Sequence, residues 1–357
     1  MSRGTLATVD IKALKHNLNT IRQHAPESKI WAVVKANGYG HGAISTAKAL
    51  TSLADGFAVS TFVEALELQQ AGITRPILLL EGCVTLDQTQ EAISRNMEMV
   101  IHNEIQLDWL TQISNLSSQK IWLKIDTGMH RLGLSPEVGT LWATKLTQEY
   151  RCKVAYITHF ACADTPEHPF NQLQLNSFAP FTKQMGCEFS MANSAAIFSL
   201  PQSRGNWIRP GIALYGASPF SDKSAQQLNL VPAMTLTAPV IAIHQIPKGQ
   251  HVGYGANWCA ERNSTIATLA IGYGDGYPRH AGNNTPTWIN GHIAPVVGRV
   301  SMDMLTIDIT DIAGIDIGND VELWGKNLSV DHVASHVGTI GYELLTRLSA
   351  RIERVYN

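Results

Sequence analysis

Residues 30–35 read IWAVVK, a short apolar run that ends abruptly at an ionisable side chain. Runs of this kind recur up to about residue 216, and amphipathic, helix-like segments separate them. The strand-like runs are Ile30–Val34, Gly56–Val59, Ile77–Leu80, Met97–Ile101, Ile121–Ile125, Val154–Ile157, Glu188–Met191 and Ile212–Leu214. Because about eight parallel strands that alternate with helices can close on themselves, the pattern predicts an α/β fold with an N-terminal (β/α)8 barrel.

The pattern changes in the last third of the chain, where strand-like runs follow one another without intervening helices. Turn signals stand at residues 247–249 and 290–291, and one short helix is expected at Val330–Val337. The strand-like runs of this part are Met234–Ile243, Thr265–Ile271, Pro295–Val300 and Met304–Ile309. We therefore expect two domains, a barrel over residues 1–228 and a mainly β domain over residues 229–357.

The composition favours a folded cytoplasmic protein without a nucleic-acid or membrane partner. Apolar residues make up 45% of the 357 and charged residues 16%, a balance that supports a large buried core. The net charge of −2 provides no basic surface, and no apolar run approaches the roughly 20 residues that span a bilayer. The start of the chain lacks a secretion signal. Its five cysteines lack C-x-x-C spacing, which indicates reduced thiols, and no metal site is expected.

A barrel predicts where the chemistry lies, because active sites of such barrels form at the carboxyl ends of the strands. Polar and ionisable side chains collect just past the strand-like runs. They are Lys35, Ser60, Glu81, His102, Asp126, His159, Asn193, Ser194 and Tyr215. This distribution predicts an enzyme, although it does not by itself identify the reaction.

The loop after the first run is rich in glycine. Residues 33–42 read VVKANGYGHG, in which glycines allow close approach of the backbone to a ligand. A partly desolvated lysine has a lowered pKa and suits Schiff-base chemistry, whereas an isolated lysine at a strand end is usually a surface residue. The segment closely resembles the pyridoxal-phosphate (PLP) lysine signature of alanine racemases. The resemblance implies that Lys35 forms the Schiff base with PLP and that Tyr39 holds the cofactor phosphate.

A second segment, residues 124–133, reads KIDTGMHRLG and resembles the family's K-x-D-T-G-M-x-R-x-G. Alternation along the preceding run points Trp122, Lys124 and Asp126 into the barrel. An inward ammonium must be paired, neutralised or modified. The resemblance implies that Lys124 is carbamylated and positions Arg131, which contacts the cofactor's phenolic oxygen and the substrate carboxylate. A plain interior ion pair between Lys124 and Asp126 is the alternative.

The later barrel segments extend the resemblance. Residues 209–216 read RPGIALYG and resemble the family's R-x-G-I-x-x-Y-G, in which the arginine faces the pyridine nitrogen of PLP. By this resemblance His159 is hydrogen-bonded to Arg209, and the cofactor is also contacted by Asn193, Ser194, Gly211 and Ile212. Because a guanidinium does not readily give up a proton, it leaves that nitrogen unprotonated and restrains side reactions other than proton removal and return.

Inversion of a stereocentre requires an acid/base on each face of the reacting carbon. The resemblance supplies Lys35 for one face and, from the segment VGYGA at 252–256, Tyr254 of the partner subunit for the other. Residues 271–276 and 298–303 read IGYGDG and GRVSMD, and they match two further family segments. The resemblance further implies that Tyr273 and Met302 contact the substrate. It also implies that Tyr342 contacts the cofactor phosphate or lies at the substrate entrance. The family forms head-to-tail homodimers with shared active sites.

The resemblance runs over nearly the whole chain and implies interconversion of L-alanine and D-alanine, with D-alanine supply for peptidoglycan. A PLP amino-acid decarboxylase of the same barrel type generally carries a glutamate at the pyridine nitrogen and a cysteine-centred motif, so Arg209 and Tyr254 argue against it. A PLP-binding protein without turnover would lack the β domain. A racemase of broader specificity stays open, because the sequence does not define the size of the substrate pocket.

Overall fold

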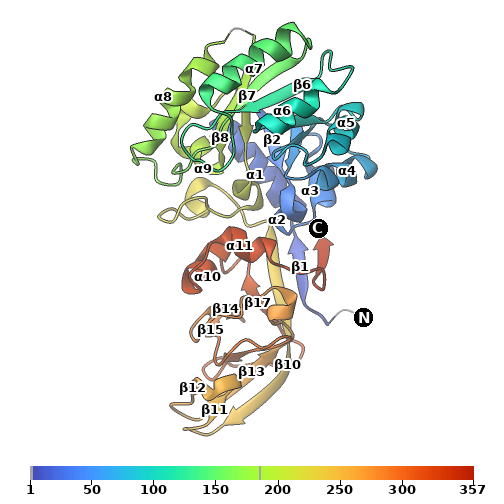
Figure 1. Cartoon of the computed structure of the whole chain (residues 1–357). Coiled ribbons are helices and arrows are strands. Elements are labelled where there is room, and N and C mark those ends of the chain that lie inside the picture. The colour runs from blue at the N-terminus through green and yellow to red at the C-terminus, as the bar shows by residue number, and fades with distance from the viewer. Residues whose placement is uncertain (1–2, 185) are drawn as a thin grey trace.

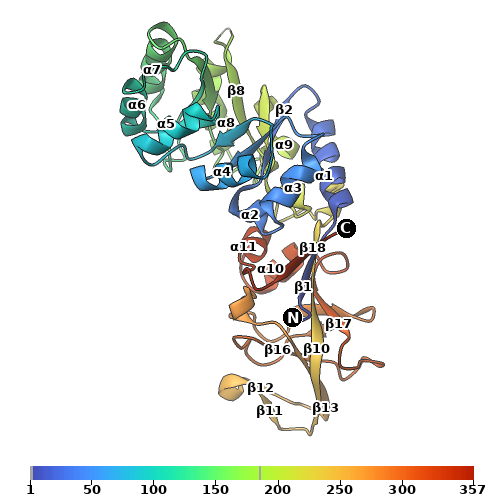
Figure 2. The same ribbon diagram turned by 90° about the vertical axis from the view of Figure 1, so that its right-hand side faces the viewer.

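The computed structural model describes residues 3–184 and 186–357, so Met1, Ser2 and Met185 lie outside the described residues. The molecule is elongated, with a closed barrel at one end and a mainly β domain at the other (Figures 1 and 2). The predicted α/β fold with a (β/α)8 barrel and a second β-rich domain is confirmed. Within the described residues, no helix has the length and apolar character needed to cross a membrane.

The barrel closes because strand β9 pairs in parallel with strand β2, which places Ile208 beside Ile30. Most strand residues are fully buried, as expected where helices cover one face and the packed interior covers the other. The strands are β2 (Lys29–Val33), β3 (Gly56–Val59), β4 (Ile77–Leu79), β5 (Glu98–Ile101), β6 (Lys120–Lys124), β7 (Lys153–Ile157), β8 (Glu188–Asn193) and β9 (Trp207–Arg209).

Most helices of the barrel part begin at a side-chain cap. Thr61 caps α4 by accepting from the Glu64 backbone, and the Glu64 carboxylate accepts in return from the Thr61 backbone. On the outside of β6, Ile125 packs so closely on α7 that a Cβ at Gly139 would collide with it, which confirms that this face points toward the helices. The helices of this part are α1 (Ile11–His24), α2 (Lys35–Tyr39), α3 (Ala43–Leu50), α4 (Phe62–Gln70), α5 (Leu86–Ser94), α6 (Glu104–Thr111), α7 (Pro136–Gln148), α8 (Phe170–Thr182) and α9 (Ser194–Ser199).

The eighth strand differs from the prediction. The run Ile212–Leu214 is not a strand but part of a buried 3₁₀ turn, and the barrel is completed instead by β9, only three residues long. Pro210 has no N–H for a ladder, and Gly211 adopts φ −111° and ψ −95°, so the chain leaves the sheet before Ile212. As a result Arg209, rather than Tyr215, is the residue at the eighth strand end.

The β domain is built around the long strand β10, which pairs antiparallel with β1, β13 and β17. Strand β1 also pairs in parallel with β18, so both ends of the chain lie in this sheet. The strands are β1 (Leu6–Val9), β10 (Met234–Ile246), β11 (His251–Val252), β12 (Trp258–Cys259), β13 (Ser264–Leu269), β14 (Pro286–Ile289), β15 (His292–Pro295), β16 (Leu305–Asp308), β17 (Asp320–Trp324) and β18 (Glu353–Tyr356). The domain boundary at residue 228 stays a prediction.

Two details of this domain differ from the sequence-based expectations. The run Pro295–Val300 is not a strand beyond Pro295; a hairpin of β14 and β15 precedes it, and Asn290 and Gly291 turn the chain with φ of 48° and 83°. The expected helix appears as α10 (Val330–His336), and a second, α11 (Gly341–Thr346), follows it. Helix α11 lies against the barrel beside α2 (Figure 1). The expected strand was misplaced because its apolar side chains are buried in a loop.

The amino ends of the barrel strands are filled by a layer of tryptophan and charge. Trp31 stacks on Trp207 with ring centroids 4.2 Å apart, and Trp122 packs edge-on against both. The Trp122 Nε1 donates to the Glu98 carboxylate at 2.5 Å, and Lys120 pairs with the same carboxylate at 3.7 Å. This layer closes one end of the barrel and leaves the other end for a site.

Candidate active site

A cavity of about 690 Å³ lies at the carboxyl ends of the barrel strands, between the rim and helix α11. Its position follows from the parallel sheet, which brings every strand end to one rim. The structure brings together here most of the residues expected from the sequence. They are Lys35, Tyr39, Lys124, Arg131, His159, Asn193, Ser194, Arg209, Gly211, Ile212 and Tyr342.

Lys35 begins a turn with unusual backbone conformation. The next residues, Ala36, Asn37 and Tyr39, have φ of 50°, 52° and 49°, in the left-handed region that costs an L-residue roughly 1–2 kcal/mol each. Hydrogen bonds offset that cost: the Ala36 N–H donates to Glu64 at 2.7 Å, and the Asn37 side chain accepts from Ala43 N–H at 3.0 Å. The Lys35 amine has no hydrogen-bond or ion-pair partner among the described residues. Strain of this kind typically occurs at functional sites.

The end of the chain holds this loop in place. Arg354 of β18 donates to the Gly40 carbonyl at 2.6 Å, and the Tyr356 hydroxyl donates to the His41 carbonyl at 3.1 Å. A Cβ at Gly40 would collide with the Leu345 carbonyl. The glycine is therefore required by close backbone approach as well as by its positive φ.

Tyr39 and His41 are buried beneath the loop. The Tyr39 ring stacks on Tyr215 with centroids 4.9 Å apart, and burial raises the pKa of its hydroxyl to about 12. His41 Nδ1 lies 2.9 Å from the Tyr39 carbonyl, while its Nε2 has no hydrogen-bond partner in the part of the chain that the structure describes. Burial lowers the pKa of His41 to about 4, so the ring is neutral at pH 7. The Tyr39 hydroxyl remains a donor, and it has no partner among the described residues.

Arg209 is fixed by a set of acceptors inside the barrel and is 5% exposed. It donates to Ser190 Oγ and the Thr158 carbonyl at 2.6 Å each, and its Nη2 lies 3.4 Å from His159 Nδ1. Burial lowers the pKa of Arg209 to about 9, which leaves it a cation at neutral pH. The pKa of His159 is held well below its usual value by burial and by the charge of Arg209. His159 is therefore a neutral ring beside a fixed cation.

Lys124 and Arg131 face the cavity without a hydrogen-bond or ion-pair partner among the residues that the structure describes. Burial, followed by the charges of Arg209 and Arg131, lowers the pKa of Lys124 to about 8. The alternative of a Lys124–Asp126 ion pair is not formed. Asp126 turns back on its own loop and accepts from Gly128 N–H at 2.9 Å.

The seventh strand end is joined to the eighth by Ser194. Its Oγ accepts from the Gly211 N–H at 2.9 Å and from the Ala213 N–H at 3.4 Å. Asn193 caps α9 by accepting from the Ala196 N–H at 3.0 Å. A Cβ at Gly211 would collide with the Tyr39 hydroxyl. Backbone, hydroxyl and phenol groups therefore converge on one wall of the cavity.

Three expected residues lie outside the cavity. Tyr254, Tyr273 and Met302 are 71%, 37% and 55% exposed and come from the β domain. Tyr254 lies on the turn between β11 and β12, a hairpin at the far end of the β domain from the barrel (Figures 1 and 2). Within one chain the structure does not bring Tyr254 near Lys35. The strand-end residues that also lie outside the cavity lining are Ser60, His102, Asp126 and Tyr215.

Sequence reasoning missed several residues of the lining. Thr158 and Leu132 lie directly beside predicted residues, and Ile340, Glu343 and Thr346 come from α11 and its start. For Ile340, Glu343 and Thr346 the sequence offered one clue, because Glu343 directly follows the predicted residue Tyr342. Their packing across the rim depends on contact between the two domains, which no local pattern encodes.

The chain was compared with known proteins. The family of the alanine racemase N-terminal domain matches residues 9–219, and that of the C-terminal domain matches residues 233–356. An alanine racemase of Vibrio parahaemolyticus is 45% identical over 356 residues, which cover 99% of each chain. The crystal structure of a biosynthetic alanine racemase from Pseudomonas aeruginosa superposes with a TM-score of 0.96, at 43% identity and 100% coverage of both chains. An alanine racemase from Bartonella henselae with covalently bound pyridoxal phosphate gives a TM-score of 0.89 at 31% identity, covering 99% of each chain.

Proposed function

The chain belongs to the alanine racemase family, and we propose that Lys35 and Tyr254 of the partner subunit exchange the α-proton of its substrate. As a member of this family it interconverts L-alanine and D-alanine and uses PLP. The observation that carries the proposal is the amine of Lys35, which lines the cavity and has no hydrogen-bond or ion-pair partner among the described residues.

The cavity suits PLP and an amino-acid carboxylate because it carries excess positive charge. The cations Lys35, Lys124, Arg131 and Arg209 line it. Among the described residues its carboxylates are Glu81 and Glu343, and Glu343 is already paired with Arg347 at 2.8 Å. Lys35 and Lys124 are half-buried and have no ion-pair partner among the described residues, so this set favours anionic ligands. We assign the phosphate to the wall formed by Tyr39, Ser194 and the backbone at Gly211.

PLP, when bound, supplies an electron-withdrawing ring that makes the α-hydrogen of an attached amino acid acidic. The chain's own residues then direct the proton. With PLP bound, Lys35 would take the α-proton or return it on one face of the substrate. Arg209, which four acceptors hold and which stays cationic, would be the residue at the pyridine nitrogen of PLP. Because a guanidinium does not readily give up a proton, it would leave that nitrogen unprotonated and limit competing reactions.

The second face requires an acid/base group of its own, and among the described residues the Tyr39 phenol that lines the cavity is assigned to the phosphate instead. We propose that Tyr254 of the partner subunit fills this role, with Tyr273 and Met302 of the partner subunit beside the substrate. Their exposure in the single chain supports a homodimer with shared active sites, because large apolar groups exposed together often mark an interface. A side chain as small as methyl fits an entrance narrowed by Tyr342 and the partner's Tyr273.

Lys124 is proposed to be carbamylated. With its pKa lowered to about 8, a substantial fraction of the amine is neutral near that pH and can attack carbon dioxide. Nζ forms a bond to the carbon and loses one proton to water, which leaves an anionic carbamate beside Arg131. At a fixed carbon dioxide pressure the carbamylated fraction rises as the pH increases from 7 to 9. Labelled bicarbonate followed by NMR measures this fraction.

The cellular role is proposed from the same family membership. We assign the protein to the cytoplasm, where its cysteines, free in the described structure, remain reduced, and to D-alanine supply for peptidoglycan.

One experiment tests the reaction. Purified protein is incubated with L-alanine in deuterated water, and optical rotation and α-hydrogen exchange are followed together. A racemase loses optical rotation and exchanges the α-hydrogen, whereas a decarboxylase releases carbon dioxide. The Lys35→Ala variant is expected to lose the covalently bound chromophore and at least about 1000-fold in turnover. Full turnover by this variant would refute the role of Lys35.

A further inference from the structure

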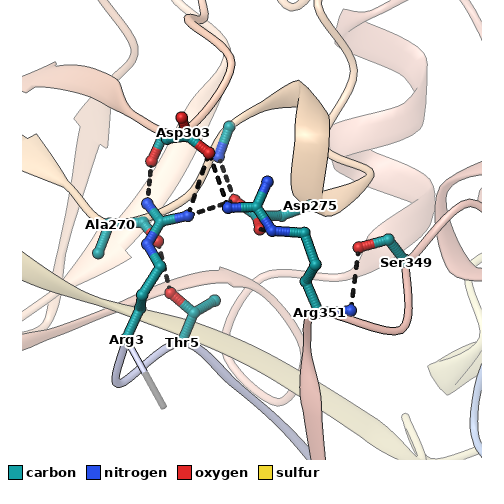
Figure 3. Close-up of polar contacts among 8 residues, drawn as sticks. Arg3, Thr5, Ala270, Asp275, Asp303, Ser349 and Arg351 are labelled. Carbon is teal, nitrogen blue, oxygen red and sulfur yellow. Dashed lines mark hydrogen bonds and ion pairs between the residues drawn. The ribbon is translucent and has the colours of Figure 1, made fainter. Parts of the chain in front are cut away.

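A second cluster of charged side chains lies in the β domain, outside the cavity. It consists of Arg3, Asp275, Asp303 and Arg351, called here the four-charge cluster (Figure 3). Its members come from the segment before β1, the turn after β13, the loop before β16 and the segment before β18. The cluster therefore joins parts of the chain that are far apart in sequence.

Each arginine of the cluster bridges both aspartates. Arg3 Nη1 lies 3.2 Å from Asp275 Oδ2 and 3.5 Å from Asp303 Oδ1. Arg351 Nε lies 3.3 Å from Asp275 Oδ1, and its Nη2 donates to Asp303 Oδ1 at 2.7 Å. The two guanidinium groups face the same pair of carboxylates (Figure 3). Two like charges can lie together here because two opposite charges are shared between them.

The cluster anchors the turn that carries Tyr273. The Asp275 side chain is 3% exposed, and besides the two arginines it accepts from the Gly272 N–H at 2.9 Å. Both residues flank Tyr273 within one short 3₁₀ turn, η5 (Tyr273–Asp275), and its N-cap. A buried carboxylate with three donors holds this backbone in one conformation.

The same cluster ties that turn to the loop that carries Met302. The Tyr273 N–H donates to the Ser301 carbonyl at 3.0 Å, and the Gly274 N–H donates to the Met302 carbonyl at 2.8 Å. Arg3 also donates to the Asp303 carbonyl. The Tyr273 and Met302 side chains themselves are partly exposed, so within one chain their positions depend on these backbone anchors rather than on packing.

We propose that the four-charge cluster is a positioning device, which sets the spacing of Tyr273 and Met302 and thereby the fit of the substrate in the partner subunit's site. The inference rests on the proposed function, in which these two side chains contact the substrate. None of the cluster residues lines the cavity, so they act through the two loops and not on the substrate. Small displacements of positioned groups are costly in catalysis, which makes such an anchor consequential.

The proposal is tested in the full-length holoenzyme with Asp303→Asn. Loss of this carboxylate's charge leaves two guanidinium groups to share Asp275, so the Met302 loop is released. We expect the KM for L-alanine to rise about fivefold while kcat changes less than about twofold, because ground-state and transition-state contacts weaken together. Arg351→Gln should act in the same direction, and Arg351→Lys, which keeps the charge, should recover part of the loss.

The matched control is Asp311→Asn. Asp311 forms an ion pair with Arg262 in the same domain, and both side chains are exposed, at 75% and 57%. In this control the same Asp-to-Asn change is made at a residue that contacts neither the Tyr273 turn nor the Met302 loop. Its KM for L-alanine is expected to equal that of the wild type. Dimer content by sedimentation and the PLP absorbance are measured for every variant, and both are expected to stay unchanged.

Two results would overturn the positioning role. One is an equal KM in Asp303→Asn, Arg351→Gln and Asp311→Asn. The other is a fall in kcat and dimer content at unchanged KM, which would indicate a merely structural cluster. If the wild type racemises alanine normally, either of these results refutes only the positioning role and leaves the proposed function standing. If the wild type does not racemise alanine, the proposed function and the positioning role are both refuted.

Discussion

The barrel rim and the loops of the β domain carry two halves of one proposed site, and the two halves differ in how exposed their side chains are. At the rim, Lys35, Arg209 and His159 lie around one cavity, and each is buried or held by the surrounding backbone. In the β domain, Tyr254 and Met302 are 71% and 55% exposed, and neither lines the cavity at the rim. The resemblance assigned both sets to the same reaction. The difference is what the proposal of a site shared between two chains predicts.

Among the variants that test how the site is divided between two chains, Tyr254→Phe is expected to have the largest effect on turnover. The variant lacks only the phenolic oxygen of an exposed side chain, so the fold, the cavity and the bound chromophore should be unchanged. Turnover should fall about 100- to 1000-fold, the usual contribution of a general acid or base. Absorbance of the cofactor and racemisation rate are measured on the same sample. Normal racemisation would show that the second base lies elsewhere.

Much of the barrel half could be predicted from the sequence because its signals are local. Runs such as Gly56–Val59 are apolar and end at a polar residue, and a closed parallel sheet then brings those residues to one rim. The eighth strand was missed because Trp207–Arg209 is short and contains an inward arginine, while the more apolar run after Gly211 is a buried turn. Hydrophobicity alone does not distinguish the two.

The rest depends on contacts between distant segments or between chains. The pairing of β1 with β10 and β18 joins both ends of the chain, and no periodicity reports it. The four-charge cluster is equally non-local, since Arg3 and Asp303 are brought together only by the folded sheet. The location of Tyr254 opposite Lys35 cannot follow from one chain's sequence pattern, because the proposal requires a second copy.

A pH-dependent loss of stability should arise in the barrel half. His41 is fully buried and its pKa is lowered to about 4, whereas in the unfolded chain a histidine has its ordinary pKa of about 6.5. The unfolded chain therefore binds the proton first as the pH falls, so stability present above pH 6.5 is lost between pH 6.5 and 4. At pH 5 the loss from this group is about 2 kcal/mol.

The free energy of unfolding of the wild type and of His41→Gln, measured by urea at pH 7 and pH 5, checks this. The variant, which cannot titrate at this position, should lose about 2 kcal/mol less between the two pH values. The control is His292→Gln in the β domain, whose exposed side chain forms no hydrogen bond or ion pair with the described residues. An identical pH dependence in His41→Gln and the wild type would contradict the role of the buried ring.

A smaller effect, on the binding of PLP, is expected at Gly211, where the cavity wall assigned to the phosphate has no room for a side chain. Gly211→Ala places a Cβ against the Tyr39 hydroxyl, so one of the two must shift. PLP should bind about tenfold more weakly, by displacement of a single anchoring hydroxyl. Titration of the apoenzyme with PLP, followed by absorbance, measures the affinity. Gly282→Ala is the control for adding a methyl group, because nothing lies within 4 Å of its Cβ position and its φ is not in the left-handed region.

The smallest effect on activity should come from the opposite end of the barrel. Glu98→Gln weakens the hydrogen bond from Trp122 and removes the pairing with Lys120, which should cost about 1 kcal/mol of stability. Because this layer lies at the amino ends of the strands, kcat and KM should stay at wild-type values. A change in kcat larger than about twofold would show that the two barrel ends are coupled.

The central claim, that each site is completed by a second copy of the chain, is tested most directly with mixed dimers. Lys35→Ala and Tyr254→Phe chains, each inactive as a homodimer, are coexpressed with different affinity tags, and the dimer that carries both tags is purified. One of its two sites then combines an intact Lys35 with an intact Tyr254, so about half of the wild-type activity per dimer is expected. Mixed dimers as inactive as either parent would place both bases in the same chain and contradict the account.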